Sequence, residues 1–196
     1  MTNPKQVQGA WRRGWTLDVQ TISSTFAGYY PNGREKFDTI RSEVGELVYQ
    51  LKYKAQTGSA DTIAEMMAEH FANKPIILSH IDLVLPMPAS TRRAVQPVYS
   101  IASELAKKLE KTYTENAIQK TKQTPSLKNI TDAEERRDVL EGAFEGVKAQ
   151  LEGKGVLLVD DLYRSGATAN AVTLALIAAG ASRVYFLAAT RTRSNT

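Results

Sequence analysis

Two consecutive aspartates, Asp160 and Asp161, stand at the point where a short apolar run ends and a turn of small residues begins. The run at 156–159 is continuously apolar with a β-branched valine at each end, which predicts a strand buried on both faces. Ser and Gly follow at 165–166, and from Thr168 the chain is alanine-rich and helix-forming. The first turn of a helix offers free backbone N–H groups and the positive end of the helix dipole to an anion. This order of elements predicts a phosphate site.

The aspartates restrict what the ligand can be. Carboxylates beside a phosphate would repel it, unless the ligand also offers hydroxyl groups or brings a hydrated divalent cation. A ribose 5-phosphate offers both kinds of group. The stretch lacks the pattern of a P-loop and is too short for a dinucleotide-binding glycine motif, so ATP hydrolysis and dinucleotide binding have little support. In the alternative interpretation, the two acids only end a strand and the Ser-Gly pair only makes a turn.

The sequence VLLVDDLYRSGAT resembles the phosphoribosyl pyrophosphate (PRPP) signature of the type I phosphoribosyltransferases. The resemblance implies an α/β fold with a parallel-sheet core flanked by helices and a small N-terminal hood. It also implies that Asp160 and Asp161 meet the ribose hydroxyls and act in catalysis, and that Mg²⁺ is held there through water or PRPP. The loop that wraps the 5-phosphate would consist of Arg164, Ser165, Gly166, Ala167 and Thr168. Arg164 occupies a place that small hydroxyl residues often hold, so its side chain must point outward or add charge at the phosphate.

Further segments, from LKYK near residue 52 to RVYFLAATRT at the end, follow the order found in the competence-associated ComF-like group. This resemblance covers roughly residues 40–192. It implies a hood at 1–40, which chooses the acceptor, and a phosphoribosyltransferase-like domain at 41–196. Many ComF-like proteins carry a four-cysteine zinc module, whereas this chain has no cysteine. The resemblance assigns Pro88, Ala89, Ser90, Arg92 and Arg93 to the pyrophosphate loop and Lys122, Lys128 and Arg136 to a flexible closing loop.

Composition limits the class of protein. The 196 residues suit one domain, and the net charge of +4 suits anionic substrates or weak nucleic-acid contact. No apolar run approaches a membrane span and the N-terminus lacks a signal-peptide core, so we expect a cytoplasmic protein without membrane contact. The two histidines, ten residues apart, lack metal-ligand spacing and are expected at the surface or at helix ends. The sequence leaves the oligomeric state open, with a homodimer as one alternative.

Periodicity and turn signals predict the elements around this site. A proline-ended strand at 81–88 would place its loop in one cleft with the acid pair if the two strands are neighbours. Residues 1–37 are irregular in pattern, with a turn signal and a weakly indicated hairpin at 29–33. Further helices are expected at 38–54, capped by Asp38 or Thr39 and ending with Lys52 and Lys54, and at 62–72, at 97–109, from a capping box at 131–134, and from 168 to Gly180. Further strands are expected at 116–120 and 183–190, with a mobile loop at 121–130.

Trp11 and Trp15 lie four residues apart with two arginines between them. They either pack an N-terminal arm onto the body, which is the favoured interpretation, or contact nucleic acid or a protein partner. The function likewise has two readings. The first is transfer of a phosphoribosyl group from PRPP to an unidentified nitrogenous acceptor, with release of pyrophosphate. The second is a non-catalytic PRPP or nucleotide sensor or DNA-uptake accessory protein, which Arg191 and Arg193 in a basic tail would serve.

Overall fold

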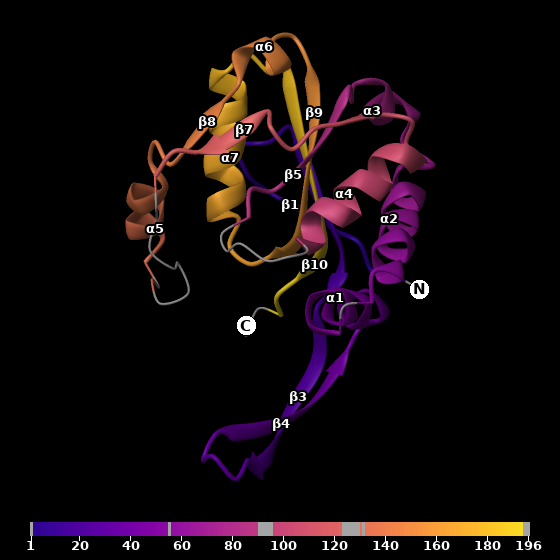
Figure 1. The fold of residues 1–196 in the computed structure, drawn as a ribbon, viewed down its shortest axis with the longest axis vertical. Coiled ribbons are helices and arrows are strands. Elements are labelled where there is room, and N and C mark those ends of the chain that lie inside the picture. The colour runs from indigo at the N-terminus through magenta and orange to yellow at the C-terminus, as the bar shows by residue number, and fades with distance from the viewer. Residues whose placement is uncertain (1, 55, 90–95, 123–129, 131, 194–196) are drawn as a thin grey trace.

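The computed structural model describes residues 2–54, 56–89, 96–122, 130 and 132–193. Within them a six-stranded sheet in the order β1-β2-β10-β9-β5-β6 forms the centre of an α/β fold (Figure 1). Its strands are β1 (Lys5–Val7), β2 (Arg13–Val19), β5 (Leu83–Pro86), β6 (Thr112–Tyr113), β9 (Gly155–Tyr163) and β10 (Arg183–Arg191). All neighbours are parallel except β1 and β2. The expected fold class is confirmed.

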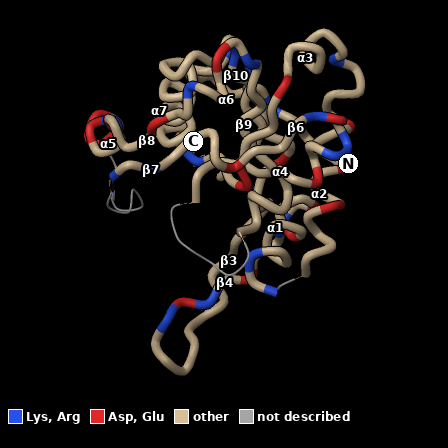
Figure 2. The backbone as a smooth tube through the Cα atoms, turned by 45° about the horizontal axis from the view of Figure 1, so that its top comes forward, with Lys and Arg blue, Asp and Glu red and all other residues tan. Residues whose placement is uncertain are grey.

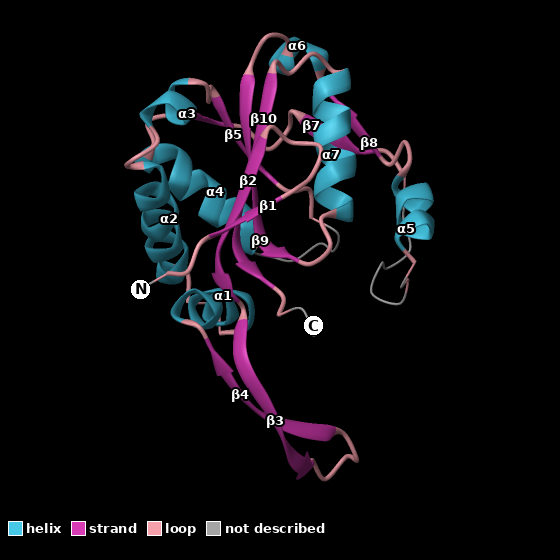
Figure 3. Cartoon of the chain, turned by 180° about the vertical axis from the view of Figure 1, so that it is seen from behind, coloured by secondary structure: helices cyan, strands magenta, loops and turns pink. Residues whose placement is uncertain are grey.

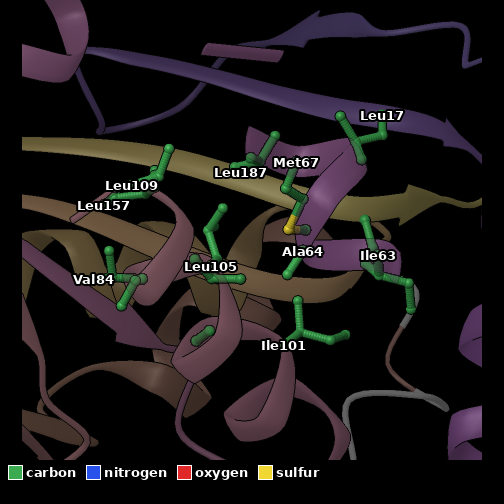
Figure 4. Packing of buried hydrophobic residues seen from close by; sticks show 14 of the residues in the cluster. Leu17, Ile63, Ala64, Met67, Val84, Ile101, Leu105, Leu109, Leu157 and Leu187 are labelled. Carbon is green, nitrogen blue, oxygen red and sulfur yellow. The ribbon is translucent and has the colours of Figure 1, made fainter. Parts of the chain in front are cut away.

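Helices cover both faces of this sheet (Figure 3). One face carries α1 (Glu43–Tyr53), α2 (Gly58–Phe71) and α4 (Pro97–Lys108), whose apolar stripes pack onto alternate residues of the strands (Figure 4). The other face carries α7 (Ala167–Ala178), packed on the remaining strand residues. The elements that complete the fold are α3 (Pro75–Ser79), α5 (Ala133–Leu140), α6 (Lys148–Leu151), and the antiparallel pair β7 (Ile118–Lys120) and β8 (Phe144–Gly146).

The N-terminal residues depart from the irregular structure that the sequence predicts. Strand β2 pairs with β10 in the middle of the sheet, and β1 adds an edge. After them β3 (Thr21–Tyr29) and β4 (Glu35–Arg41) form the hairpin that the turn signal at 29–33 indicates. Residues 1–40, expected as one hood segment, are thus divided between the central sheet and this hairpin, which we call the ribbon.

Several predicted boundaries were wrong, including the start of α2, which is Gly58 and not residue 62. Helix α1 begins at Glu43 and not at residue 38, because residues 35–41 pair with β3 and Ser42 caps the helix by accepting from the Gly45 N–H at 3.0 Å. Strand β9 runs beyond both aspartates, because β10 is equally long and pairs with it as far as Tyr163. Helix α5 is capped by Asp132, which accepts from the Glu135 N–H. Most of the loop at 121–130 lies outside the described residues.

The tryptophans pack onto the body, as favoured from the sequence. Trp11 is 5% exposed and its ring stacks on Phe186 at 4.7 Å, while Trp15 is 7% exposed and packs against Phe71. Arg191, which the sequence placed in a basic tail, is largely buried and donates to Thr16 Oγ1 at 3.1 Å. Neither the tryptophans nor Arg191 is therefore exposed for nucleic acid.

Candidate functional site

Strands β5 and β9 are parallel neighbours, which confirms that their loops open at one edge of the sheet. The Met87 N–H donates to the Val159 carbonyl at 2.7 Å, so Pro88 and Ala89 emerge beside the first aspartate. The Ala89 N–H is 3.5 Å from the Tyr99 hydroxyl. The other residues expected in the pyrophosphate loop, Ser90, Arg92 and Arg93, lie outside the described residues.

A lysine side chain of the protein forms an ion pair with one of the two aspartates. Lys52, in the last turn of α1, donates from Nζ to Asp161 Oδ1 at 2.7 Å, and the two side chains are 15% and 16% exposed. Asp160 Oδ1 instead accepts from the Asp161 N–H at 2.8 Å. From the sequence alone, Lys52 is expected only as a cation favoured at a helix end. No local pattern links it to a residue in a strand more than a hundred positions later.

Burial, together with the neighbouring Asp161 charge, raises the pKa of Asp160 to about 8. One carboxyl of the pair therefore holds a proton at neutral pH, and the other faces an ammonium group. Two adjacent carboxyls with few other oxygen donors suit a divalent cation that is held chiefly by a ligand's own oxygens. Among the described residues, no group of three or more histidines, aspartates and glutamates could enclose a metal. The residues thus fit Mg²⁺ that arrives with PRPP, as the resemblance implies.

The turn after β9 leads into α7 through a glycine with left-handed backbone geometry. Gly166 has φ of +76° and precedes the helix, whose first internal backbone bond runs from Asn170 N to the Gly166 carbonyl at 2.8 Å. No side chain in the described part of the chain caps α7. The N–H groups at 167–169 therefore have no partner within the helix, and the positive end of its dipole faces the turn. Arg164 and Ser165 are exposed there, whereas Gly166 is buried and Thr168 is half-buried.

Replacing Gly166 with alanine should destabilise the fold by about 1–3 kcal/mol, because the backbone is left-handed and a new Cβ would lie 2.9 Å from Cε2 of Tyr163. Gly33→Ala is the matched control, since Gly33 has φ of +78° with nothing within 4 Å of the added carbon. Urea unfolding of both variants separates backbone strain from contact with the tyrosine. Equal losses would mean that Tyr163 moves aside without cost.

The residues expected in the flexible loop are not brought to the acid pair by any described contact. Lys122 is exposed and donates from Nζ to the Glu141 carbonyl at 3.1 Å, which ties the end of β7 to the segment before β8. Arg136 lies in α5, on the α7 side of the sheet, and Lys128 lies outside the described residues. A largely apolar groove of about 810 Å³ runs between α5 and α7 and reaches Ser165. Its lining contains neither Asp160 nor Asp161.

Two buried groups make stability depend on pH. Because the pKa of Asp160 is raised to about 8, the folded chain keeps a proton that the unfolded chain loses near pH 4. The pKa of His70 is lowered to about 4 by burial and then by Lys74, so the unfolded chain takes up a proton below about pH 6.5 that the folded chain refuses. Between pH 4 and 6.5, a rise in pH lowers the free energy of unfolding through Asp160 and raises it through His70. Above pH 6.5, of these two groups only Asp160 still makes the free energy of unfolding depend on pH.

We therefore expect the free energy of unfolding to fall between pH 6.5 and 8, by at most about 2 kcal/mol. Urea unfolding at the two pH values measures the fall. Asp160→Asn, which resembles the protonated acid, should remove it. A fall of the same size in this variant would assign the pH dependence to another group.

The family model of the phosphoribosyl transferase domain matches residues 50–196, so the chain belongs to that family. It is also 25% identical over 137 residues to the amidophosphoribosyltransferase of Haemophilus influenzae, an alignment that covers 70% of this chain and 25% of that protein. The chain thus spans about a quarter of the length of that relative. Its site belongs to a PRPP-dependent class of domain, and the acceptor is not identified by these matches.

Two solved structures match parts of the chain. The glutamine PRPP amidotransferase from B. subtilis, complexed with ADP and GMP, has a TM-score of 0.49 and 18% identity, covering 81% of this chain and 34% of that one. A hypoxanthine phosphoribosyltransferase from Staphylococcus aureus has a TM-score of 0.41 and 12% identity, covering 72% and 70%. No helix in the described residues is both long and apolar enough to span a membrane.

Proposed function

We propose that this chain is a phosphoribosyltransferase that binds PRPP with Mg²⁺ and transfers its phosphoribosyl group to a nitrogenous acceptor, releasing pyrophosphate. The observation that carries the proposal is the junction of β9 and α7, where two aspartates and an uncapped helix start occur together in a domain of this family. We further propose that the chain belongs to the ComF-like group. We also propose that it acts in the cytoplasm, a reducing compartment that suits a chain without cysteine.

In this proposal each part of the junction has a separate task. The N–H groups at 167–169 and the dipole of α7 hold the 5-phosphate. Asp160 and Asp161 accept hydrogen bonds from the ribose hydroxyls and lie near the anomeric carbon, where positive charge develops as the C–O bond to pyrophosphate breaks and the bond to the acceptor nitrogen forms. Bound Mg²⁺ supplies positive charge for the departing pyrophosphate.

Helix α1, which carries Lys52, connects the acid pair to the ribbon. Lys52 contacts Asp161 at one end of α1, and the other end follows directly from β4 at Ser42. We propose that the ribbon is the part of residues 1–40 that acts as the hood over the acceptor. In this proposal Pro88, Ala89, Ser90, Arg92 and Arg93 bind the pyrophosphate, and the 121–137 segment closes over bound PRPP. The ammonium group holds the Asp161 carboxyl in place before PRPP arrives.

Calorimetric titration with PRPP and Mg²⁺ tests the proposal. Wild type should bind, and Asp160→Asn should bind at least about tenfold more weakly, because a carboxylate that ionises beside Mg²⁺ supplies negative charge and two accepting oxygens, whereas the amide supplies no charge and one accepting oxygen. Asp18→Asn on β2 is a control of the same chemistry, because this carboxyl accepts from the Val19 N–H and lies near Arg191, with no described contact to Asp160 or Asp161. Absence of binding to wild type would overturn the proposal.

If PRPP binds, turnover separates the enzyme from a sensor. Release of pyrophosphate should then be measured with purine bases, pyrimidine bases and simple amines as candidate acceptors. Release that depends on one acceptor class and is lost in Asp160→Asn supports a transferase. Tight binding without release for any class supports the non-catalytic reading.

A further inference from the structure

The ribbon formed by β3 and β4 extends away from the body (Figures 1 and 3). In the described residues it is a two-stranded sheet, and neither of its outer edges pairs with another strand. Its base is fastened by Arg193, which donates to the Ile22 carbonyl at 2.8 Å, and by Arg41, which lies 3.8 Å from the Tyr49 ring centroid. A two-stranded sheet by itself is only marginally stable in water.

Large apolar side chains cover this ribbon although they are not buried. Six of them are between 46% and 67% exposed, and Phe26 forms the centre of a cluster with ring centroids of Tyr29 and Phe37 at 5.2 and 5.8 Å. An exposed aromatic cluster of this kind marks an interaction site. The six residues are Ile22, Phe26, Tyr29, Tyr30, Phe37 and Ile40.

The two edges of the ribbon differ in regularity. The register shifts twice, between Thr21 and Ser23 and between Phe26 and Tyr29, and each time the additional residue lies on β3. Bulges of this kind bend a strand and protect its edge from further pairing. The edge of β4 has no such interruption between Glu35 and Arg41. Only β4 therefore offers a regular edge to another strand.

The β4 sequence is complementary in charge to a second copy of itself that runs antiparallel. If two β4 strands pair antiparallel about a two-fold axis at Phe37, Phe37 meets its own copy and Lys36 faces Asp38 of the second copy, twice. Opposite charges directly across a ladder stabilise it. Since side chains alternate along a strand, the charged pairs lie on one face and the phenylalanines on the other, where they extend the aromatic cluster.

The charges also distinguish between classes of partner. The segment of the ribbon around the axis carries Arg34, Glu35, Lys36 and Asp38, so both signs alternate along it (Figure 2). A nucleic acid or an anionic membrane would favour an excess of positive charge. Alternating positive and negative side chains at this spacing match a second β4 strand that runs in the opposite direction.

We propose that two copies of this chain associate through antiparallel pairing of their β4 edges, forming a four-stranded sheet. The two bodies then lie at opposite ends of that sheet. In this register residue 33 of one copy lies opposite residue 41 of the other, so each turn reaches the base of the other ribbon. That base leads directly into α1, the helix that carries Lys52. The proposal is independent of whether the chain transfers phosphoribosyl groups.

Sedimentation velocity over a range of protein concentrations tests the pairing by charge exchange. Lys36→Glu and Asp38→Lys should each raise the dimer dissociation constant at least about tenfold, because each creates like charges across the ladder twice. The double variant Lys36→Glu/Asp38→Lys should restore the dimer. Arg34→Glu is the matched control, because Arg34 would face the uncharged Ile40.

A single engineered thiol provides a second test, because the chain has no cysteine of its own. Directly opposed residues in an antiparallel ladder have Cα atoms about 4.5–5.5 Å apart, which a disulfide can bridge. Phe37→Cys should therefore form a covalent dimer under mild oxidation. Asn32→Cys, at the exposed turn and about 17 Å from the axis along the strand, should not.

Three results would overturn the proposal. A monomer at every concentration would mean that the ribbon binds a different partner, whether protein, membrane or nucleic acid. A dimer that is insensitive to both charge reversals would place the interface elsewhere. Equal oxidation of the two cysteine variants would indicate random collision. Near-ultraviolet circular dichroism of each variant verifies that the body remains folded.

Discussion

Replacing Lys52 with methionine should lower the free energy of unfolding by about 2–4 kcal/mol. The substitution keeps most of the apolar stem and removes the ammonium group, so Asp161 is left buried without its 2.7 Å partner beside a second carboxyl. Removing one partner of a largely buried ion pair is more destabilising than removing both. Asp161→Asn should also destabilise, because it leaves the ammonium group unpaired, and the double variant should recover much of the loss.

Urea unfolding of the four proteins in this cycle measures the coupling between the two side chains. Lys54→Met is the control, because Lys54 lies at the end of the same helix and is exposed. A loss for Lys52→Met no larger than for Lys54→Met would mean that the pair contributes nothing to stability.

The second large effect is expected at Trp11. Its replacement by alanine should cost about 3–5 kcal/mol, because a nearly buried ring is lost from a contact with Phe186 at 4.7 Å and with Tyr163 at 6.4 Å. The indole also donates to the Val7 carbonyl at 3.0 Å, which holds β1. Thermal and urea unfolding measure the loss, and Trp11→Phe should retain part of the stability.

Trp15→Ala serves as the comparison for this prediction. Trp15 packs in the core on the opposite face of the sheet, next to Phe71, and has no described contact with Tyr163 or Gly166. Both variants should be destabilised, but only loss of Trp11 removes support from Tyr163, which packs against Gly166. PRPP affinity at a temperature where both are folded should fall in Trp11→Ala alone. Unchanged stability of Trp11→Ala would instead favour a surface role for this ring.

Local signals predicted the parts of the site that are formed by neighbouring residues. A buried strand, an acid pair, a glycine turn and an alanine-rich helix occupy one continuous stretch, and each element has its own propensity. The helix α4 was predicted equally well, because a proline at its first turn and one apolar stripe define it. Gly180, at φ of +100°, ends α7 where the sequence indicated.

The parts that the sequence missed depend on residues far apart in the chain. Strand β2 looks irregular because both of its faces and one edge are determined by pairing with β10 and by packing against helices that come later. The ion pair of Lys52 with Asp161 has no local pattern for the same reason. Residues 38–41 were taken into a helix because the apolar stripe that begins at Val44 does not show where the preceding strand ends.

The position of β2 in the sheet has a consequence for how the chain folds as it is synthesised. Trp15 leaves the ribosome long before its ladder partner Leu187, because the two residues are 172 positions apart in the chain. The apolar side chains of β2 therefore remain without their strand neighbour while the intervening residues are translated. Such long-range pairing slows folding and prolongs the exposure of an unpaired strand. The nascent chain should accordingly be most prone to misassociation, and most dependent on chaperones, in the interval before β10 emerges.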